Sequence, residues 1–121
     1  GYILIDGGAG STVEFISGTR PLPMHRKDII VAHALAGQYL GMKFIYLEAG
    51  SGAKEPVSTS IIKAVSKAIN IPIIVGGGIN TPGIAKSAVD AGASIVVTGT
   101  VIEKHPGLIK RFADAIHYKS T

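Results

Sequence analysis

The chain has 121 residues, a formal net charge of +4 at pH 7, no cysteine and 16 glycines, and 46% of its residues are hydrophobic. The apolar content excludes a disordered chain, the absence of cysteine excludes disulfide bonds and thiolate metal sites, and the thinly spread lysines do not predict a nucleic-acid surface. The length allows one domain, but a small domain buries a small fraction of its chain, so this hydrophobic content is high for an independent one.

Apolar periodicity predicts strands and helices in alternation. In chain order we expect a strand at 2–5, a short extended piece at 11–16, an irregular segment at 17–23, a helix at 27–40, a strand at 43–48, a helix at 57–69, a strand at 72–75, a helix at 82–91, a strand at 94–97, a short turn at 101–104 and a helix at 106–118. Such alternation produces a parallel sheet covered by helices, with right-handed crossovers. The predicted fold class is therefore α/β.

Each helix is expected to bury one apolar face. For 27–40 this face comprises Ile29, Ile30, Ala36, Gly37 and Leu40, with His33 packed among them. For 57–69 it comprises Val57, Ile61, Ile62, Val65 and Ile69. For the last helix it comprises Leu108, Ile109, Phe112, Ala113 and Ile116. In the helix at 82–91, Thr81 is expected as the N-cap, Pro82 as the first helical residue and Gly92 as the residue that ends it.

Every predicted strand runs into a loop that contains glycine. The continuous branched run at 72–75 predicts burial on both faces and ends in Gly76-Gly77-Gly78, and the strand at 94–97 ends in Thr98-Gly99-Thr100. These spacings match neither a dinucleotide fingerprint nor a P-loop. In β/α barrels the loops after the last two strands and a short helix often hold phosphate. We therefore favour a phosphate site in a barrel over glycines that only form tight turns.

A phenol and a carboxylate share one face of the predicted strand at 43–48. Tyr46 and Glu48 lie two residues apart and point together, whereas Ile45 and Leu47 point toward the helices. A carboxylate at the ligand-facing end of a barrel strand either accepts hydrogen bonds from a polyol or pairs with a basic residue such as Lys54. We favour the polyol.

With these residues in view, the sequence resembles the geranylgeranylglyceryl phosphate synthase family, which are archaeal prenyltransferases. The resemblance runs over essentially the whole chain, and its most specific motif is Tyr-Leu-Glu-Ala-Gly-Ser-Gly-Ala at 46–53. The glycine loops within 72–82 and 96–100 are similar but generic among phosphate-binding barrels. The run at 2–8 looks like the family's fifth strand. The loop at 17–23 and the helix after it look similar to those of the branch of the family whose members form larger assemblies.

The resemblance implies a reaction. Such enzymes join sn-glycerol 1-phosphate to geranylgeranyl diphosphate, with Mg²⁺ assisting departure of diphosphate. Carried onto this chain, Glu48 would accept the proton and, with Tyr46, hold the glycerol hydroxyls. The full expected substrate site is Tyr46, Glu48, Ala49, Gly50, Ser51, Gly76, Gly77, Gly78, Gly99 and Thr100.

Several other side chains have two open interpretations. Asp6 could line the diphosphate side of the site or cap the glycine turn that follows it. Ser51 could contact the glycerol or stabilise its own loop. For Arg20 we favour a contact between subunits over a contact with diphosphate. The remaining histidines, His25, His105 and His117, are not spaced for metal binding.

Four strands are half of a β/α barrel, which takes about 250 residues and eight strands. We interpret residues 1–121 as the C-terminal half of one barrel domain, strands five to eight, without a second domain. The resemblance places the magnesium ligands in the N-terminal half, so none is expected here. Two alternatives stay open: another phosphate-binding barrel enzyme, such as a phosphosugar isomerase or aldolase, and a catalytically incomplete half-barrel.

Partners and location are expected as follows. We expect the two substrates, a homo-oligomer, no nucleic acid, and transient proximity to membranes through the lipid product. Glycines and prolines interrupt the uncharged run between Lys67 and Lys86, which does not fit a spanning helix. The absence of cysteine fits a reducing cytoplasm, which is the expected location, and residues 1–5 do not look like a signal peptide.

Overall fold

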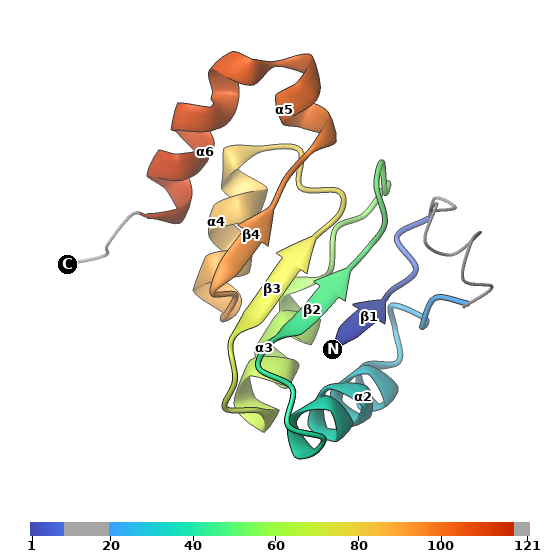
Figure 1. Ribbon diagram of the computed structural model, residues 1–121. Coiled ribbons are helices and arrows are strands. Elements are labelled where there is room, and N and C mark those ends of the chain that lie inside the picture. Colours follow the sequence, from blue (N-terminus) through green and yellow to red (C-terminus); the bar gives the residue numbers. More distant parts are fainter. Residues whose placement is uncertain (9–19, 118–121) are drawn as a thin grey trace.

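A computed structural model describes residues 1–8 and 20–117 of the chain (Figure 1). Its elements in chain order are β1 (Tyr2–Leu4), α2 (Lys27–Tyr39), β2 (Ile45–Glu48), α3 (Thr59–Ala68), β3 (Ile73–Gly76), α4 (Pro82–Ala91), β4 (Ile95–Val97), α5 (Thr100–Lys104), the 3₁₀-helix η1 (Pro106–Leu108) and α6 (Ile109–Ile116). The predicted alternation is confirmed. The extended piece expected at 11–16 lies outside the described residues, as does Tyr118 at the end of the last predicted helix.

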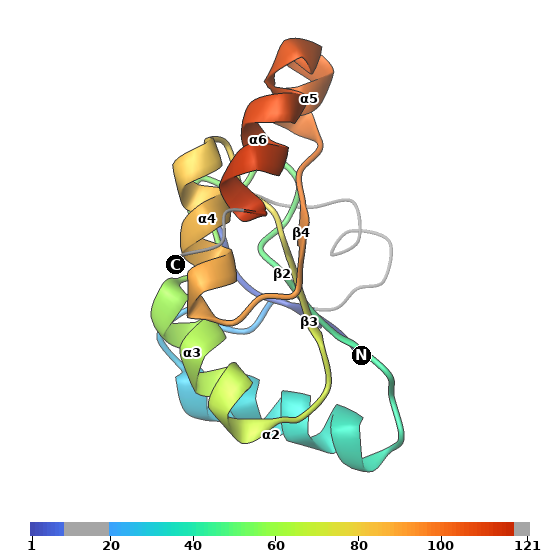
Figure 2. The ribbon, with the colours of Figure 1, turned by 90° about the vertical axis from the view of Figure 1, so that its left-hand side faces the viewer.

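The four strands form one parallel sheet in the order β1-β2-β3-β4. Helices α2, α3 and α4 cover one face of this sheet (Figure 2), and α6 packs against α4. The register pairs Leu4 with Glu48 and Glu48 with Gly76, so the carboxyl ends of β1, β2 and β3 lie side by side. The loops that follow β2, β3 and β4 therefore lie at one end of the sheet.

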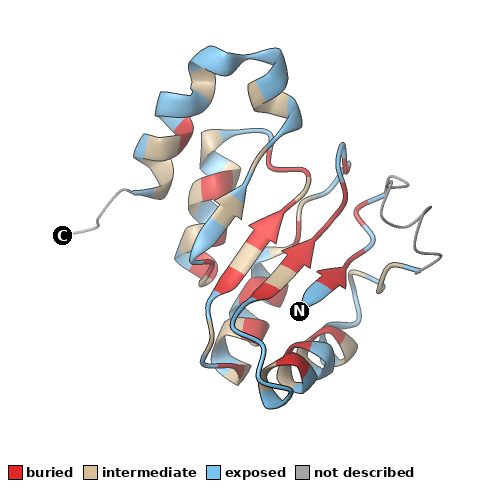
Figure 3. Cartoon of the chain, in the orientation of Figure 1, coloured by how far each residue is buried: buried red, intermediate tan, exposed pale blue. Residues whose placement is uncertain are grey.

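Strict alternation separates the two faces of the sheet. Ile45 and Leu47 point toward the helices and are fully buried, as predicted, and so are Ile73 and Val75 on β3. Most of β2 and β3 is buried (Figure 3). The opposite face carries the exposed apolar side chains of Tyr2, Phe44, Ile95 and Val97. The expectation that the strand at 72–75 is buried on both faces is wrong in this structure, because Ile74 lies on the uncovered face and is half-buried.

The core face of α2 differs from the predicted one. Ile30, Ala34 and Gly37 are buried, at helical spacings of four and three residues. His33, expected to be packed, is exposed, and its Nδ1 lies 2.9 Å from the carbonyl oxygen of Ile29. Leu40 is exposed as well, because α2 ends at Tyr39 and Leu40 is only its C-cap residue.

The other helices follow the sequence more closely. The five predicted core residues of the 57–69 segment are all buried. The Thr81 hydroxyl accepts the N–H of Ile84 at 3.2 Å, and Gly92 ends α4 with a φ of 128°. In the last helix Phe112 is buried, but Ile109 is exposed, because it begins α6 where the chain enters from η1.

The buried face of β2 should dominate stability. Replacing Leu47, which is completely buried, with alanine should lower the free energy of unfolding by about 2–5 kcal/mol, because methyl groups are lost and a cavity is left. The same substitution at Leu40, 77% exposed, should change it by less than about 0.5 kcal/mol. Urea unfolding of both variants measures the difference. Equal losses would contradict this assignment of the core.

Within residues 1–8 and 20–117, no helix is long and apolar enough to cross a membrane.

Candidate functional site

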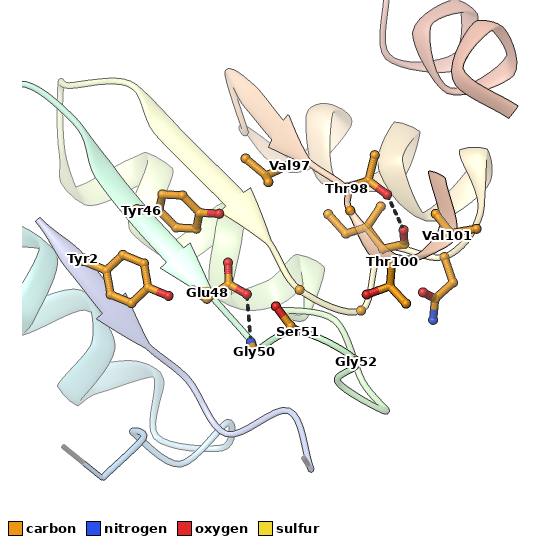
Figure 4. A pocket seen from close by; sticks show the side chains of 15 residues that line it. Tyr2, Tyr46, Glu48, Gly50, Ser51, Gly52, Val97, Thr98, Thr100 and Val101 are labelled. Carbon is orange, nitrogen blue, oxygen red and sulfur yellow. Dashed lines mark hydrogen bonds between the residues drawn. The ribbon is translucent and has the colours of Figure 1, made fainter. Parts of the chain in front are cut away.

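A pocket of about 260 Å³ opens where the loops after β2, β3 and β4 meet (Figure 4). Eight of the ten residues expected to bind substrate line it: Tyr46, Glu48, Gly50, Ser51, Gly77, Gly78, Gly99 and Thr100. Segments separated by more than fifty residues thus form one cavity, as expected for the carboxyl ends of parallel strands.

Three expected residues lie outside the pocket lining. Ala49 is buried, and its N–H donates to the carbonyl oxygen of Gly76, 3.0 Å away. Gly76 is buried at the end of β3. Asp6 Oδ1 accepts the N–H of Gly8 at 2.9 Å, which favours the turn-capping interpretation over a place on the diphosphate side. Arg20 is exposed and does not line the pocket either.

Glu48 is the one buried charged side chain in the described part of the chain, with 8% of its surface exposed. Its Oε1 accepts the N–H of Gly50 at 3.0 Å, so the loop after β2 fixes the orientation of the carboxylate. Among the described residues Glu48 makes no ion pair, and the alternative pairing with Lys54 is not seen. Its other oxygen, Oε2, lies beside the Tyr46 hydroxyl, which hydrogen-bonds the carboxylate, and it retains a lone pair for a ligand.

Two phenols adjoin this carboxylate. Tyr2 and Tyr46 are partners in the β1–β2 register, and their ring centroids are 5.1 Å apart. Burial, with the adjoining Glu48 carboxylate, raises the pKa of Tyr46 well above 10, and the same two causes raise the pKa of Tyr2. Both hydroxyls therefore stay protonated at neutral pH and can donate hydrogen bonds to a ligand.

The glycines after β3 permit close contact with the loop after β2. Gly77 has a φ of +88°, and a Cβ there would lie 2.7 Å from the Gly50 nitrogen and 2.8 Å from Glu48 Oε1. A Cβ on Gly78 would lie 3.0 Å from the Pro56 nitrogen. Gly77 and Gly78 line the pocket, and because they lack side chains the loop after β2 can pack directly against them. The same glycines therefore permit both tight turns and access of a ligand.

The loop after β4 has room for a ligand. Gly99 precedes α5, and a Cβ built there would meet nothing within 4 Å. Because Thr100 and Val101 begin α5, their N–H groups have no acceptor within the helix. The Thr98 hydroxyl donates to the carbonyl oxygen of Ile79 at 3.1 Å and so ties this loop to the one after β3.

The described residues contain no group of three His, Asp or Glu side chains that could hold a metal ion. His25, His105 and His117 are exposed, at a loop or at the ends of helices. None of the residues that line the pocket is Lys or Arg. Binding of an anion in this pocket would therefore depend on backbone N–H groups and hydroxyls.

Sequence reasoning missed several residues that line the pocket, among them Tyr2, Asn80 and Thr98. Alternation along 2–6 was the available signal for Tyr2, since Tyr2, Leu4 and Asp6 share one face of the strand. Asn80 and Thr98 carried no local signal, because their placement depends on how the loops after β3 and β4 meet.

Comparison with known proteins agrees with this geometry. The sequence pattern of the PcrB family matches residues 1–117. The chain belongs to the PcrB family. This assignment and the likeness to solved β/α barrels confirm both the resemblance inferred from the 46–53 motif and the fold class.

Three proteins similar to this PcrB family member are geranylgeranylglyceryl phosphate synthases. The geranylgeranylglyceryl phosphate synthase of Chitinophaga pinensis is 50% identical over 117 residues, which cover 97% of this chain and 46% of that protein. That of Thermococcus gammatolerans is 52% identical over 103 residues, 85% of this chain and 40% of that protein. The crystal structure of (S)-3-O-geranylgeranylglyceryl phosphate synthase from Thermoplasma acidophilum, in complex with its substrate sn-glycerol 1-phosphate, is 35% identical with a TM-score of 0.87 and covers 95% of this chain and 47% of that one. The PcrB chain thus spans about half the length of the relatives it matches.

Proposed function

We propose that this chain forms the glycerol phosphate half of a geranylgeranylglyceryl phosphate synthase. One observation carries the proposal: Tyr46 and Glu48 converge with the glycine loops after β3 and β4 in a single pocket. The Thermoplasma acidophilum enzyme, crystallised with sn-glycerol 1-phosphate, matches 95% of the chain that forms this pocket.

The pocket has a polar composition suited to a phosphorylated polyol. The Glu48 carboxylate would accept hydrogen bonds from the glycerol hydroxyls, and the Tyr46 hydroxyl would donate one. Backbone N–H groups of Gly77, Gly78, Gly99 and Thr100 would bind the phosphate. Ser51 lines the same pocket and could add a hydroxyl contact.

The proposed reaction is an alkyl transfer. A glycerol hydroxyl oxygen attacks the allylic carbon of geranylgeranyl diphosphate, a carbon–oxygen bond forms, and the bond from that carbon to diphosphate breaks. The hydroxyl proton passes to Glu48, which lies at the ligand-facing end of β2.

Mg²⁺ does not fit the residues that the structure describes, because they offer one pocket carboxylate and no cluster of acidic ligands. We propose that its ligands, and most of the prenyl groove, belong to the N-terminal half of a longer protein. Strands β1 and β4 are the two edges of the sheet, and in that protein each would pair with a strand of the other half to close an eight-stranded barrel. We further propose a cytoplasmic homo-oligomer that meets membranes transiently through its lipid product.

Ligand binding tests the proposal. Calorimetric titration of the chain, alone and mixed with the complementary N-terminal half, should show saturable binding of sn-glycerol 1-phosphate. Inorganic phosphate should bind more weakly, because it lacks the hydroxyls that Glu48 and Tyr46 would contact. Failure of sn-glycerol 1-phosphate to bind under both conditions would refute the proposed function.

A further inference from the structure

Gly76 occupies the point where β3 meets the polar side chains of β2. A Cβ built on it would lie 2.7 Å from Glu48 Oε2 and 2.7 Å from the Tyr46 hydroxyl oxygen. It would also lie 3.3 Å from the Val97 Cβ on β4. Both polar atoms thus occupy space that a side chain at position 76 would take.

The backbone does not require glycine at this position. Gly76 is not among the glycines with positive φ, whereas Gly77 and Gly78 are. The missing side chain, and not conformational freedom, is therefore what position 76 contributes. The Ala49 N–H donates to the Gly76 carbonyl oxygen at 3.0 Å, so moving β3 away from β2 to make room would break this hydrogen bond.

The space over Gly76 brings a donor and an acceptor together. Glu48 Oε1 is occupied by the Gly50 N–H, which leaves Oε2 as the oxygen that lies over Gly76. The Tyr46 hydroxyl reaches the same space, and burial together with the Glu48 carboxylate raises its pKa. A protonated hydroxyl beside a carboxylate oxygen offers a hydrogen-bond donor and an acceptor, which suits binding of the hydroxyl groups of a ligand.

We propose that Gly76 is a positioning residue that determines specificity. Because it lacks a side chain, the Tyr46 hydroxyl and Glu48 Oε2 can lie side by side and bind the hydroxyl groups of a polyol together. It does so without lining the pocket, and this role differs from the phosphate contact that its place in the glycine run predicts. The inference rests on the proposed function. It implies that position 76 sets the preference for a phosphorylated polyol over free phosphate.

Gly76→Ala in the full-length protein tests this role, with Gly83→Ala as the matched control. A Cβ at Gly83 would meet nothing closer than the Thr81 hydroxyl at 3.9 Å. In Gly76→Ala the affinity for sn-glycerol 1-phosphate should fall about tenfold or more, the loss expected for a displaced hydrogen-bonding pair, while the affinity for inorganic phosphate changes less than about twofold. The control should change neither affinity.

A double-mutant cycle separates positioning from a general loss of structure. The losses caused by Gly76→Ala and Tyr46→Phe should combine to less than their sum, since both act on the same pair. Additive losses, or an equal fall in affinity for both ligands, would overturn the inference. If Gly76→Ala does not fold by circular dichroism, the double variant should regain part of the fold, because it removes one of the two 2.7 Å contacts. A double variant that is equally unfolded would also count against it.

A ligand-free measurement keeps this inference distinct from the proposed function. In the parent protein Tyr46 should resist ionisation at about pH 11, where an exposed tyrosine is largely ionised. Separation from Glu48 and greater exposure should lower the pKa of Tyr46 in Gly76→Ala, so ultraviolet difference spectra should show additional tyrosinate, absent from Gly83→Ala. Unchanged ionisation would overturn the inference. If the parent protein binds no sn-glycerol 1-phosphate, the proposed function fails, and the tyrosine spectra alone decide whether Gly76 positions the pair.

Discussion

Replacing Glu48 with glutamine in the full-length protein should lower kcat for prenyl transfer by about 10²–10⁴-fold, the usual contribution of a general base. Glutamine retains an oxygen that can accept the Gly50 N–H, so the loop after β2 keeps its anchor. It removes the negative charge and, with it, the group that takes the hydroxyl proton in the proposed reaction. Steady-state kinetics with both substrates measure the effect.

Glu55→Gln is the matched control for that experiment. Glu55 lies in the same connection between β2 and α3, but it is exposed and absent from the pocket lining. Its substitution should leave both kcat and KM near the parent values. A Glu48→Gln enzyme with unchanged turnover would show that the assigned role of Glu48 is wrong.

Gly77→Ala should be among the most destabilising single-methyl changes in the chain. A left-handed backbone disfavours any Cβ, and this one would also press on the Gly50 backbone at 2.7 Å and on Glu48 Oε1 at 2.8 Å. Together the strain and the overpacking should lower the free energy of unfolding by about 2–4 kcal/mol. Urea unfolding followed by circular dichroism measures the loss.

Gly41→Ala separates the two causes. Gly41 has nearly the same φ, +85°, but a Cβ there would meet nothing within 4 Å. This variant should therefore lose only the strain contribution, about 1–2 kcal/mol. If both variants lost the same stability, the contact between the β2 and β3 loops would not be the constraint that we assign to Gly77.

Much of the fold could be predicted from local patterns. The two-residue period along β2 assigned Ile45 and Leu47 to the core and Tyr46 and Glu48 to the opposite face, and all four lie where expected. The Thr81 N-cap could also be predicted, because its partner, the Ile84 N–H, is only three residues away along the chain. Signals of this kind act within one element and need no knowledge of its neighbours.

The incorrect assignments of helix faces share a cause. Periodicity shows that a helix has an apolar face, but the core around it decides which residues that face includes. His33 and Leu40 of the α2 segment and Ile109 of α6 are therefore exposed, although each fits an apolar pattern. Asp6 had two interpretations of equal merit, and the Gly8 N–H beside it favours turn capping.

By itself the sequence determined a parallel α/β architecture and which side chains of β2 point toward the core. It also determined a site of glycines, a phenol and a carboxylate at the strand ends. The tertiary structure decided which of those residues meet, because contacts between strands depend on register. Register sets Tyr2 beside Tyr46 and Glu48 beside Gly76. The high glycine content that stands out in so small a chain thereby acquires distinct roles: Gly99 leaves open space before α5, Gly77 accommodates the β2 loop, and Gly76 leaves room for two polar side chains.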